Sequence, residues 1–279
     1  MADPVALESR LQQLWDGGRK FQQCKGIHSG PVIIFASGPS AAQFPLERYA
    51  RVPFITMNGA IARFSQTSVR PLFYLCDDQG FVRERRQLVL DGIRLAKHAA
   101  LGANALKVLM QASPDAVEMA DPHLMLRVNR PLAGAPLSDR QFAWQARGNA
   151  ELECGFSLFQ RKPNRIGFSR NMQFGYFGGR TIPYAAVQLA FHLGFDRVFL
   201  VGMDLNAQTG RFYEQAGDAL PSRLDDDYVD YILPSFQLMA KRVVGENFQV
   251  FNLSTDSRMP STIVPKIDLV QFEALLARS

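Results

Sequence analysis

The sequence predicts an α/β fold: a Rossmann-like, mainly parallel sheet flanked by helices. Short apolar runs rich in β-branched residues alternate with longer segments of helical periodicity, a pattern typical of a parallel sheet. Several of the predicted strands also end in Gly, Ser, Asn or Asp. Ligands bind at the carboxyl ends of the strands in such sheets, so we expect one site where these strand ends meet.

Composition narrows the class of protein. The chain has 279 residues, 47% of them hydrophobic and 20% charged, which is ordinary for a globular protein. Its net charge of +5 suits an anionic partner without requiring one. The three cysteines form no CxxC pair and the four histidines show no metal-ligand spacing, which argues against a disulfide framework and a zinc site. With neither a long apolar run nor a secretory leader in the sequence, we expect a cytoplasmic protein.

Each predicted element is a segment bounded by turn-forming residues. We expect residues 1–30 to be an N-terminal helical extension and residues 31–279 to be a single α/β domain. Apolar runs predict strands at residues 31–36, 53–57, 71–76, 106–110, 124–128, 197–202 and 248–253. Helical spacing predicts helices at residues 4–15, 82–101, 183–193, 228–243 and 268–277, with Gly194 as a helix cap.

Residues 127–180 differ from the rest of the chain. They contain nine basic and three acidic residues, a net charge of +6, together with eight aromatic residues. This composition predicts a basic insertion that faces an anionic acceptor. A solvated loop with a small satellite core is the alternative.

Polar loops follow three of the predicted strands. Ser37-Gly38-Pro39-Ser40 follows the first, where glycine allows close approach of a ligand and free amides can hold phosphate. This loop matches neither GxGxxG nor the P-loop pattern. Asn58 follows the second strand and could equally be a turn residue. Asp77 and Asp78 follow the third; they could contact ribose, a base or a divalent metal, or cap the next helix. Because no DxD triplet is present, we infer no metal.

Several of these segments resemble a family of transferases. SGPS (37–40), MNG (57–59) and GGRTIPYAAVQLAFHLGFDRVFLVGMDL (178–205) are similar to the bacterial sialyltransferase type of CMP-sugar transferase. Residues 35–61 and 71–78 and the RVNRP box at 127–131 more closely resemble the lipopolysaccharide core transferases that add a third 3-deoxy-D-manno-octulosonic acid (Kdo).

The resemblance implies a set of nucleotide-binding residues. It places the first loop against the phosphate and ribose of CMP. The ends of the second and third strands and the loop before residue 183 lie near the nucleotide, and the end of the GxD strand lies beside the ribose. The residues at these positions are Ser37, Gly38, Ser40, Asn58, Asp77, Asp78, Gly179, Thr181, Gly202 and Asp204. A lid over residues 205–228 should follow. In the related enzymes this lid carries two tyrosines. This chain has Asn206 at the position of the first, and Tyr213 is the plausible replacement for the second.

The general base departs from the pattern. The related enzymes use a histidine after the lid, and this chain has none there. Asp230 or Asp227 could accept the proton instead. The alternative is that these acids simply begin the helix expected at 228–243.

The resemblance implies that the chain moves Kdo from CMP-Kdo to the lipopolysaccharide inner core, with inversion and without a metal ion or another cofactor. Arginines are expected to bind the sugar carboxylate and acceptor anions, namely Arg127, Arg130, Arg165, Arg170 and Arg180. The lipid A–core acceptor implies peripheral contact with the anionic cytoplasmic face of the inner membrane. No nucleic-acid motif is present.

Three alternatives remain open at this point. The same loops could serve a sialyltransferase-like enzyme. They could also serve a pterin pyrophosphokinase-like enzyme, with ATP and Mg²⁺ held by Asp77 and Asp78. Outside the enzymes, the chain could be a non-catalytic, membrane-associated assembly factor for the core pathway.

Overall fold

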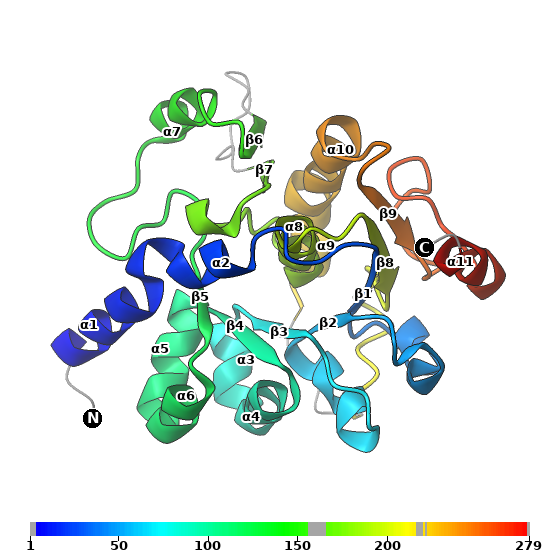
Figure 1. The fold of residues 1–279 in the computed structure, drawn as a ribbon, viewed down its shortest axis with the longest axis horizontal. Helices are drawn as coiled ribbons and strands as arrows, with labels where there is room; N and C mark the ends of the chain where they lie inside the picture. Colours follow the sequence, from blue (N-terminus) through cyan, green and yellow to red (C-terminus); the bar gives the residue numbers. More distant parts are fainter. Residues whose placement is uncertain (1–3, 156–165, 216–219, 221, 278–279) are drawn as a thin grey trace.

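A seven-stranded, all-parallel sheet forms the centre of the computed structural model, which describes residues 4–155, 166–215, 220 and 222–277 (Figure 1). The strand order is β5-β4-β3-β2-β1-β8-β9. The strands are β1 (Pro31–Phe35), β2 (Phe54–Met57), β3 (Phe73–Cys76), β4 (His98–Gly102), β5 (His123–Met125), β8 (Arg197–Val201) and β9 (Gln249–Asn252). The order reverses between β1 and β8, which creates a crevice at their carboxyl ends. The α/β prediction is confirmed.

Helices cover both faces of the sheet. One face carries α8 (Ile182–Leu193) and α10 (Leu233–Arg242). The other face carries α3 (Gln79–Glu84), α4 (Arg86–Leu95), α5 (Ala103–Ala112), α6 (Pro114–Ala120) and α11 (Leu269–Leu276). At the amino terminus, α1 (Pro4–Trp15) and α2 (Arg19–Cys24) run beside β5 and α8 (Figure 1).

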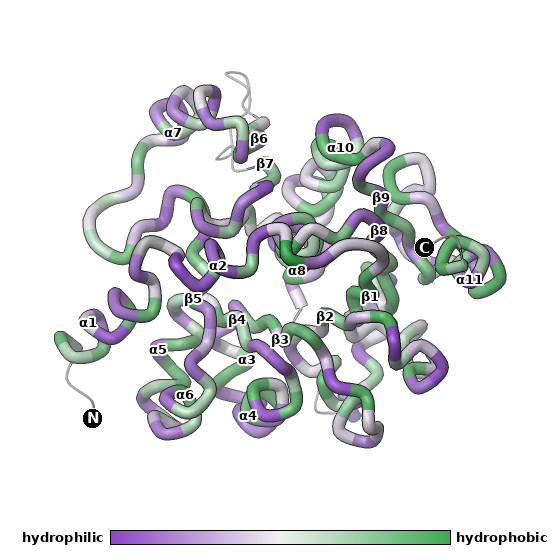
Figure 2. The backbone as a smooth tube through the Cα atoms, in the orientation of Figure 1, coloured by the Kyte–Doolittle hydropathy of each residue, from purple (hydrophilic) through white to green (hydrophobic). Residues whose placement is uncertain are grey.

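Burial on both faces explains why the strands are continuous apolar runs. Along β1, Val32 and Ile34 pack on the α8 side, while Ile33 and Phe35 pack on the other. Helix α8 is buried almost all round, as its sequence predicts, and Gly194 ends it with a φ of 99°. Hydrophobic residues accordingly concentrate in α8 and the strands beside it, whereas hydrophobic and hydrophilic residues alternate along the outer helix α1 (Figure 2).

Two predicted elements are wrong. The helix expected over residues 82–101 ends at Leu95, and His98–Gly102 forms strand β4. The strand expected at 106–110 is part of helix α5. Alanine-rich β4 carries no β-branched residue, so its pairing with β3 and β5, rather than its composition, makes it a strand. In α5 the apolar run is long enough to resemble a strand, although Ala105, Leu106 and Leu109 bury a helical face.

The basic insertion contains α7 (Asp139–Ala146) and an antiparallel hairpin of β6 (Leu152–Gly155) and β7 (Ile166–Ser169). Its aromatic residues Phe168, Tyr176 and Phe177 are buried in the same core as α8. Helix α7 lies at the outer end of this segment (Figure 1). The insertion therefore packs onto the α8 face of the sheet.

Candidate active site

The crevice between β1 and β8 holds a compact polar cluster. The amide of Ser40 donates to Oδ2 of Asp204 at 2.9 Å, and the Ser40 hydroxyl donates to Oδ1 at 2.5 Å. A Cβ on Gly38 would lie 2.3 Å from Oδ2 of Asp204, so glycine is needed for this approach. Gly202 has a φ of 73° and would clash with Ala36 if it carried a Cβ. The structure thus brings together the four predicted residues Gly38, Ser40, Gly202 and Asp204.

Two amides of the first loop, those of Gly38 and Ser40, are occupied, whereas free amides were expected there. Gly38 N donates to Gly202 O at 2.9 Å, and Ser40 N donates to Asp204. These amides are therefore not free to hold phosphate. Each Asp204 oxygen accepts one bond from Ser40 and keeps a second lone pair, so the carboxylate can still accept a ribose hydroxyl. Ser37 contributes its carbonyl, which accepts from Phe212 N at 3.1 Å.

Residues after β9 also reach this cluster, and the sequence analysis missed them. The hydroxyls of Ser254 and Ser40 lie 2.8 Å apart. Arg258 N donates to Asp204 O at 2.9 Å, its guanidinium lies 3.9 Å from the centre of the Tyr228 ring, and it pairs with Asp225. A strand was predicted at 248–253, so the expectation that ligands bind at the carboxyl ends of the strands could have been applied to this loop too.

Asn58 stands at the end of β2 in a left-handed conformation, with a φ of 44°. Its Oδ1 is buried and has no hydrogen-bond partner. A buried unsatisfied oxygen of this kind is costly unless a ligand satisfies it. Asn58 is therefore a clear candidate for a hydrogen bond to a ligand at this site.

Two residues of the predicted lid, Phe212 and Tyr213, lie against the loops after β1 and β2. Phe212 donates its amide to Ser37, and the ring of Tyr213 packs so closely on Gly59 that a Cβ there would lie 2.2 Å from Cζ. Burial raises the pKa of Tyr213 to about 12. Asn206, by contrast, forms a local turn in which Oδ1 accepts from Gln208 N at 3.0 Å.

The two acids after β3 have separate environments. Asp77 accepts from Nε and Nη2 of Arg127, at 2.8 and 2.5 Å, and from the hydroxyl of Tyr176. Burial lowers the pKa of Arg127, but Tyr176 and Asp77 raise it to a net value above the usual range. Asp78 caps α3 through Gly80 N and Phe81 N, as the alternative prediction had it.

These roles leave no pair of carboxylates at β3 free to bind a cation. Within the described ranges, no three His, Cys, Asp or Glu side chains are grouped as metal ligands would be. Tyr176, which the sequence analysis also missed, lies in the basic insertion, and nothing in its local sequence indicates a contact with Asp77.

The loop before α8 adds a guanidinium to the site. Gly179 and Arg180 both adopt positive φ, 51° and 56°. For a non-glycine residue this conformation is strained, and such strain is concentrated at functional sites. Arg180 lies over the ring of Tyr231, 5.0 Å from its centre. Thr181 is the N-cap residue of α8, but its side chain makes no capping hydrogen bond.

The two candidate bases differ in burial. Asp227 ends α9 (Leu224–Asp227), is 7% exposed, and lies 3.9 Å from Nε of Arg180. Asp230 is exposed on the π-helical turn Tyr228–Ile232. That turn precedes Pro234, which has no amide hydrogen for the carbonyl four residues earlier. π-helical turns are frequent at functional sites.

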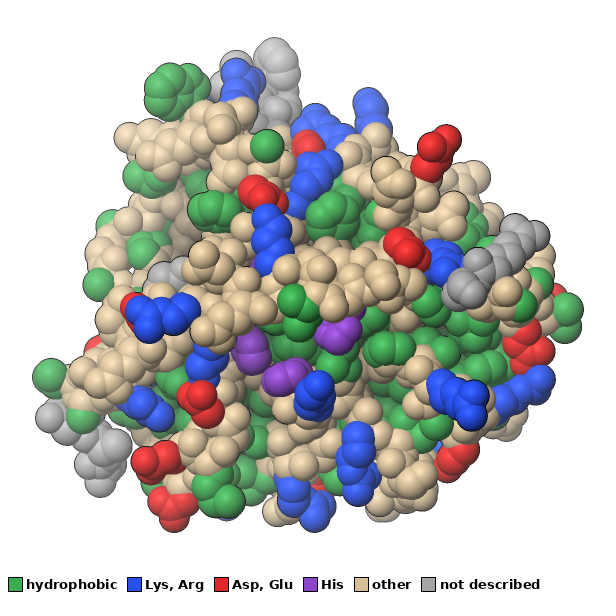
Figure 3. Space-filling view, in the orientation of Figure 1, with side chains coloured by type: hydrophobic (Ala, Val, Ile, Leu, Met, Phe, Trp, Pro, Cys, Tyr) green, Lys and Arg blue, Asp and Glu red, His purple; other side chains and the backbone are tan. Residues whose placement is uncertain are grey.

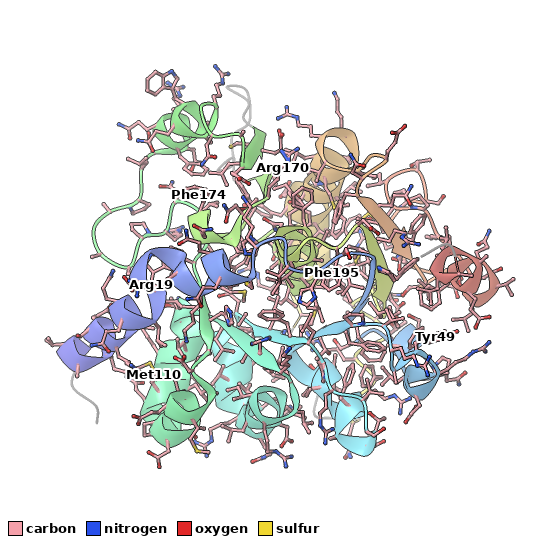
Figure 4. All side chains as sticks on the ribbon, viewed as in Figure 1. Arg19, Tyr49, Met110, Arg170, Phe174 and Phe195 are labelled. Atoms are coloured by element: carbon pink, nitrogen blue, oxygen red, sulfur yellow. The ribbon has the colours of Figure 1, made fainter. Side chains whose placement is uncertain are left out.

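One predicted anion ligand lies elsewhere. Arg170 donates to Glu153 at 2.7 Å and to the carbonyl of Arg242 at 3.0 Å, between β7 and α10 (Figure 4). Its guanidinium also lies over Phe191, near the end of α8, about 13 Å along the helix from Ile182. Arg170 therefore lies apart from the loop before α8, and its role in binding substrate stays a prediction. Arg165 lies outside the described residues, and Arg130 lies near Arg127 after β5.

Comparisons with known proteins place the chain in a family. The model of a family described as 3-deoxy-D-manno-octulosonic acid transferase WaaZ matches residues 22–270. The chain belongs to this family. It is 30% identical over 243 residues to a probable 3-deoxy-manno-octulosonic acid transferase of Salmonella typhimurium LT2, covering 86% of this chain and 88% of the relative. A protein of the same description from Escherichia coli K12 is 28% identical over 248 residues, 88% of this chain and 85% of the relative.

A glycosyltransferase structure, MAf from Magnetospirillum magneticum AMB-1, is 12% identical, with a TM-score of 0.45. The comparison covers 96% of this chain and 41% of that protein.

In this WaaZ-family chain, all four histidines lie away from the carboxyl edge of the sheet. His98 and His123 begin β4 and β5, and their rings lie 5.6 Å apart. His28 stacks on Phe195 at 5.0 Å, and histidine side chains gather near the centre of this face (Figure 3). His192 is buried and bonded to Phe21 O, and burial lowers its pKa to about 4. None of the four histidines is therefore placed to accept a proton at the strand ends that form the candidate site.

Proposed function

We propose that this chain transfers Kdo from CMP-Kdo to a hydroxyl of the lipopolysaccharide inner core, with inversion and without a metal ion. The observation that carries the proposal is the polar cluster of Ser40, Asp204 and Ser254, which lies where the strand order reverses. The unsatisfied oxygen of Asn58 is at the end of the neighbouring strand β2. Asp204 has lone pairs for a ribose hydroxyl, and Asn58 offers an acceptor to the nucleotide. Membership of the WaaZ family supports Kdo transfer as the reaction.

The proposed step is a single displacement. The acceptor oxygen forms a bond to the anomeric carbon of Kdo while the bond from that carbon to the CMP phosphate oxygen breaks. CMP leaves with the electron pair, and the proton of the acceptor hydroxyl passes to a carboxylate. Asp227 is our choice for this base, because it is buried and lies near the loop before α8, whereas Asp230 is exposed.

Donors on the protein stabilise the leaving phosphate in this proposal. Because burial raises the pKa of Tyr213 to about 12, its hydroxyl remains protonated at neutral pH and can donate a hydrogen bond. Arg180 adds a positive charge at the start of α8. Hydrogen bonds to a developing anion are stronger in a partly desolvated site than in water, so these groups can act without a cation.

Helix α7 is the proposed contact with the anionic membrane surface that holds the acceptor. None of the helices in the described part of the chain has the length and apolar content of a membrane span. On α7, Trp144 is 76% exposed, and the exposed Arg140 and Arg147 lie on the same helical face. Tryptophan and arginine together favour a membrane interface. Phe142 of α7 packs against Phe177, 6.2 Å between ring centres, next to the loop before α8.

The test is a transfer assay with CMP-Kdo and a lipid A–core acceptor, with the anomeric configuration of the product determined by NMR. We expect an inverted Kdo linkage and an unchanged rate in EDTA. A retained configuration or loss of activity in EDTA would contradict the mechanism. Turnover of CMP-sialic acid only, hydrolysis of ATP only with Mg²⁺, or absence of any turnover would instead support one of the three alternatives.

A further inference from the structure

A cavity of about 390 Å³ opens between helix α1 and the segment that follows β5. Gln12 and Trp15 of α1 line one wall, and residues 126, 127 and 129–133 line the other. Phe174, a residue of the basic insertion that is 50% exposed, also lines the cavity (Figure 4). The cavity thus joins two segments that are more than one hundred residues apart in sequence.

The wall after β5 is a fixed structure. Asn129 adopts a φ of 55°, and its side-chain amide makes two hydrogen bonds to the backbone of Leu137, both 2.8 Å long. These bonds close the loop 130–136. On the other side, Tyr176 N donates to Leu126 O at 2.9 Å, and Val128 N donates to Tyr176 O at 3.0 Å. The cavity is therefore shaped in advance of binding, which lowers the entropic cost of a ligand.

Arg127 connects this cavity with the nucleotide side of the site. It lines the cavity, and two of its nitrogens are held by Asp77 at the end of β3. A Cβ on Gly178, in the loop before α8, would lie only 3.7 Å from Nε of Arg127. A ligand in the cavity would therefore lie beside the donor.

The lining has the chemistry of a site for an acidic sugar. Its charged members are Arg127 and Arg130, and none of the described residues lining it is acidic. Guanidinium groups pair with carboxylates and phosphates in a planar, two-bond geometry. The indole of Trp15 offers an apolar face to a sugar ring.

We propose that this cavity binds an acidic sugar of the acceptor, so that the hydroxyl to be glycosylated lies next to the donor. This inference rests on the proposed function, because it assigns the second substrate of the same reaction. Arg130 and Trp15 are its specificity determinants, and Arg127 is shared with the donor side.

Two variants test the cavity by different means. Arg130→Ala removes a guanidinium, and Ala133→Trp fills the space. Both should weaken binding of a deacylated, Kdo-containing lipid A oligosaccharide, measured by titration calorimetry, by about ten- to a hundred-fold. In the transfer assay, both should raise the KM for the acceptor and leave the KM for CMP-Kdo unchanged. Arg130→Lys should restore part of the affinity.

Arg94→Ala is the matched control, because Arg94 is a 72% exposed arginine on α4. It should bind the oligosaccharide as the unmodified chain does. Equal affinity of Arg130→Ala, Ala133→Trp and the control would overturn the proposal, as would absence of binding by the unmodified chain. Binding that the two variants weaken, in a chain that transfers no Kdo, would support the cavity and reject the proposed function.

Discussion

Asp204 shows how one residue fixes the geometry of the site. Its two oxygens accept from the amide and the hydroxyl of Ser40, and its backbone carbonyl accepts from Arg258 N. It therefore ties the loops after β1, β8 and β9 to one another. The predicted role of Asp204 beside the ribose stays a prediction, but its position between three strand ends makes it the anchor of the site.

Asp227→Asn tests the proposed base. The variant keeps the size and burial of the side chain but cannot accept the acceptor proton, so kcat should fall by about a hundred-fold or more. Steady-state transfer kinetics measure this loss. Asp226→Asn, an exposed neighbour, is the matched control and should retain full activity. If Asp230→Asn loses activity and Asp227→Asn does not, the base is Asp230.

Tyr213→Phe tests the leaving-group donor. Removal of the hydroxyl should lower kcat by about ten- to a hundred-fold and leave binding of the acceptor unchanged. Because burial raises the pKa of Tyr213 to about 12, the hydroxyl remains a donor below that pH. The kcat of the unmodified chain should therefore show no tyrosine titration between about pH 7 and pH 10. Full activity in the phenylalanine variant would refute the assignment.

At the scale of elements, each part of the site is a loop that follows a parallel strand. The loops after β1, β2, β3 and β8 were predictable because each begins with small or polar residues. The pairing of Asp77 with Arg127 was not, since that contact depends on how β3 and β5 lie in the sheet. Nor was the hydrogen bond from the amide of Ser40 to Asp204. Both facts are tertiary, and no local pattern encodes them.

Gly59→Ala tests the contact between the β2 loop and the lid. The added Cβ would lie 2.2 Å from Cζ of Tyr213, so the ring must move away. We expect kcat to fall at least as far as in Tyr213→Phe, with a loss of about 1–3 kcal/mol in unfolding free energy. Gly245→Ala, where no atom lies within 4 Å of the added Cβ, is the control. Equal transfer rates in the two variants would contradict a role in transfer for the contact between Tyr213 and Gly59.

Over the whole molecule, the parallel sheet was predictable because strands buried on both faces are continuous apolar runs. The errors at β4 and α5 arose where alanine or unbroken apolar residues make helix and strand look alike. The position of Arg170 could not be predicted for a different reason. Its charge suits a substrate, but in the fold it joins the hairpin to α10, near the far end of α8.

The proposed contact with the membrane concerns the whole molecule, and in our proposal it depends on α7. Arg140→Ala with Arg147→Ala should weaken binding to phosphatidylglycerol vesicles by about 1 kcal/mol per arginine, and Trp144→Ala should weaken it further. Co-sedimentation measures the loss, with neutral phosphatidylcholine vesicles and the Arg94→Ala variant as controls. Unchanged partitioning of the α7 variants would place the membrane contact on another face.

The central claim is that the crevice between β1 and β8 binds the CMP part of the donor. A thermal-unfolding titration with CMP, CDP, UDP, ATP and NAD, with and without Mg²⁺, tests it most directly. CMP at one hundred times its Kd should stabilise the chain by about 2.7 kcal/mol without Mg²⁺. Asp204→Ala should abolish that gain while remaining folded in the absence of nucleotide. Stabilisation by Mg-ATP alone, by none of the nucleotides, or equally in Asp204→Ala would contradict the account.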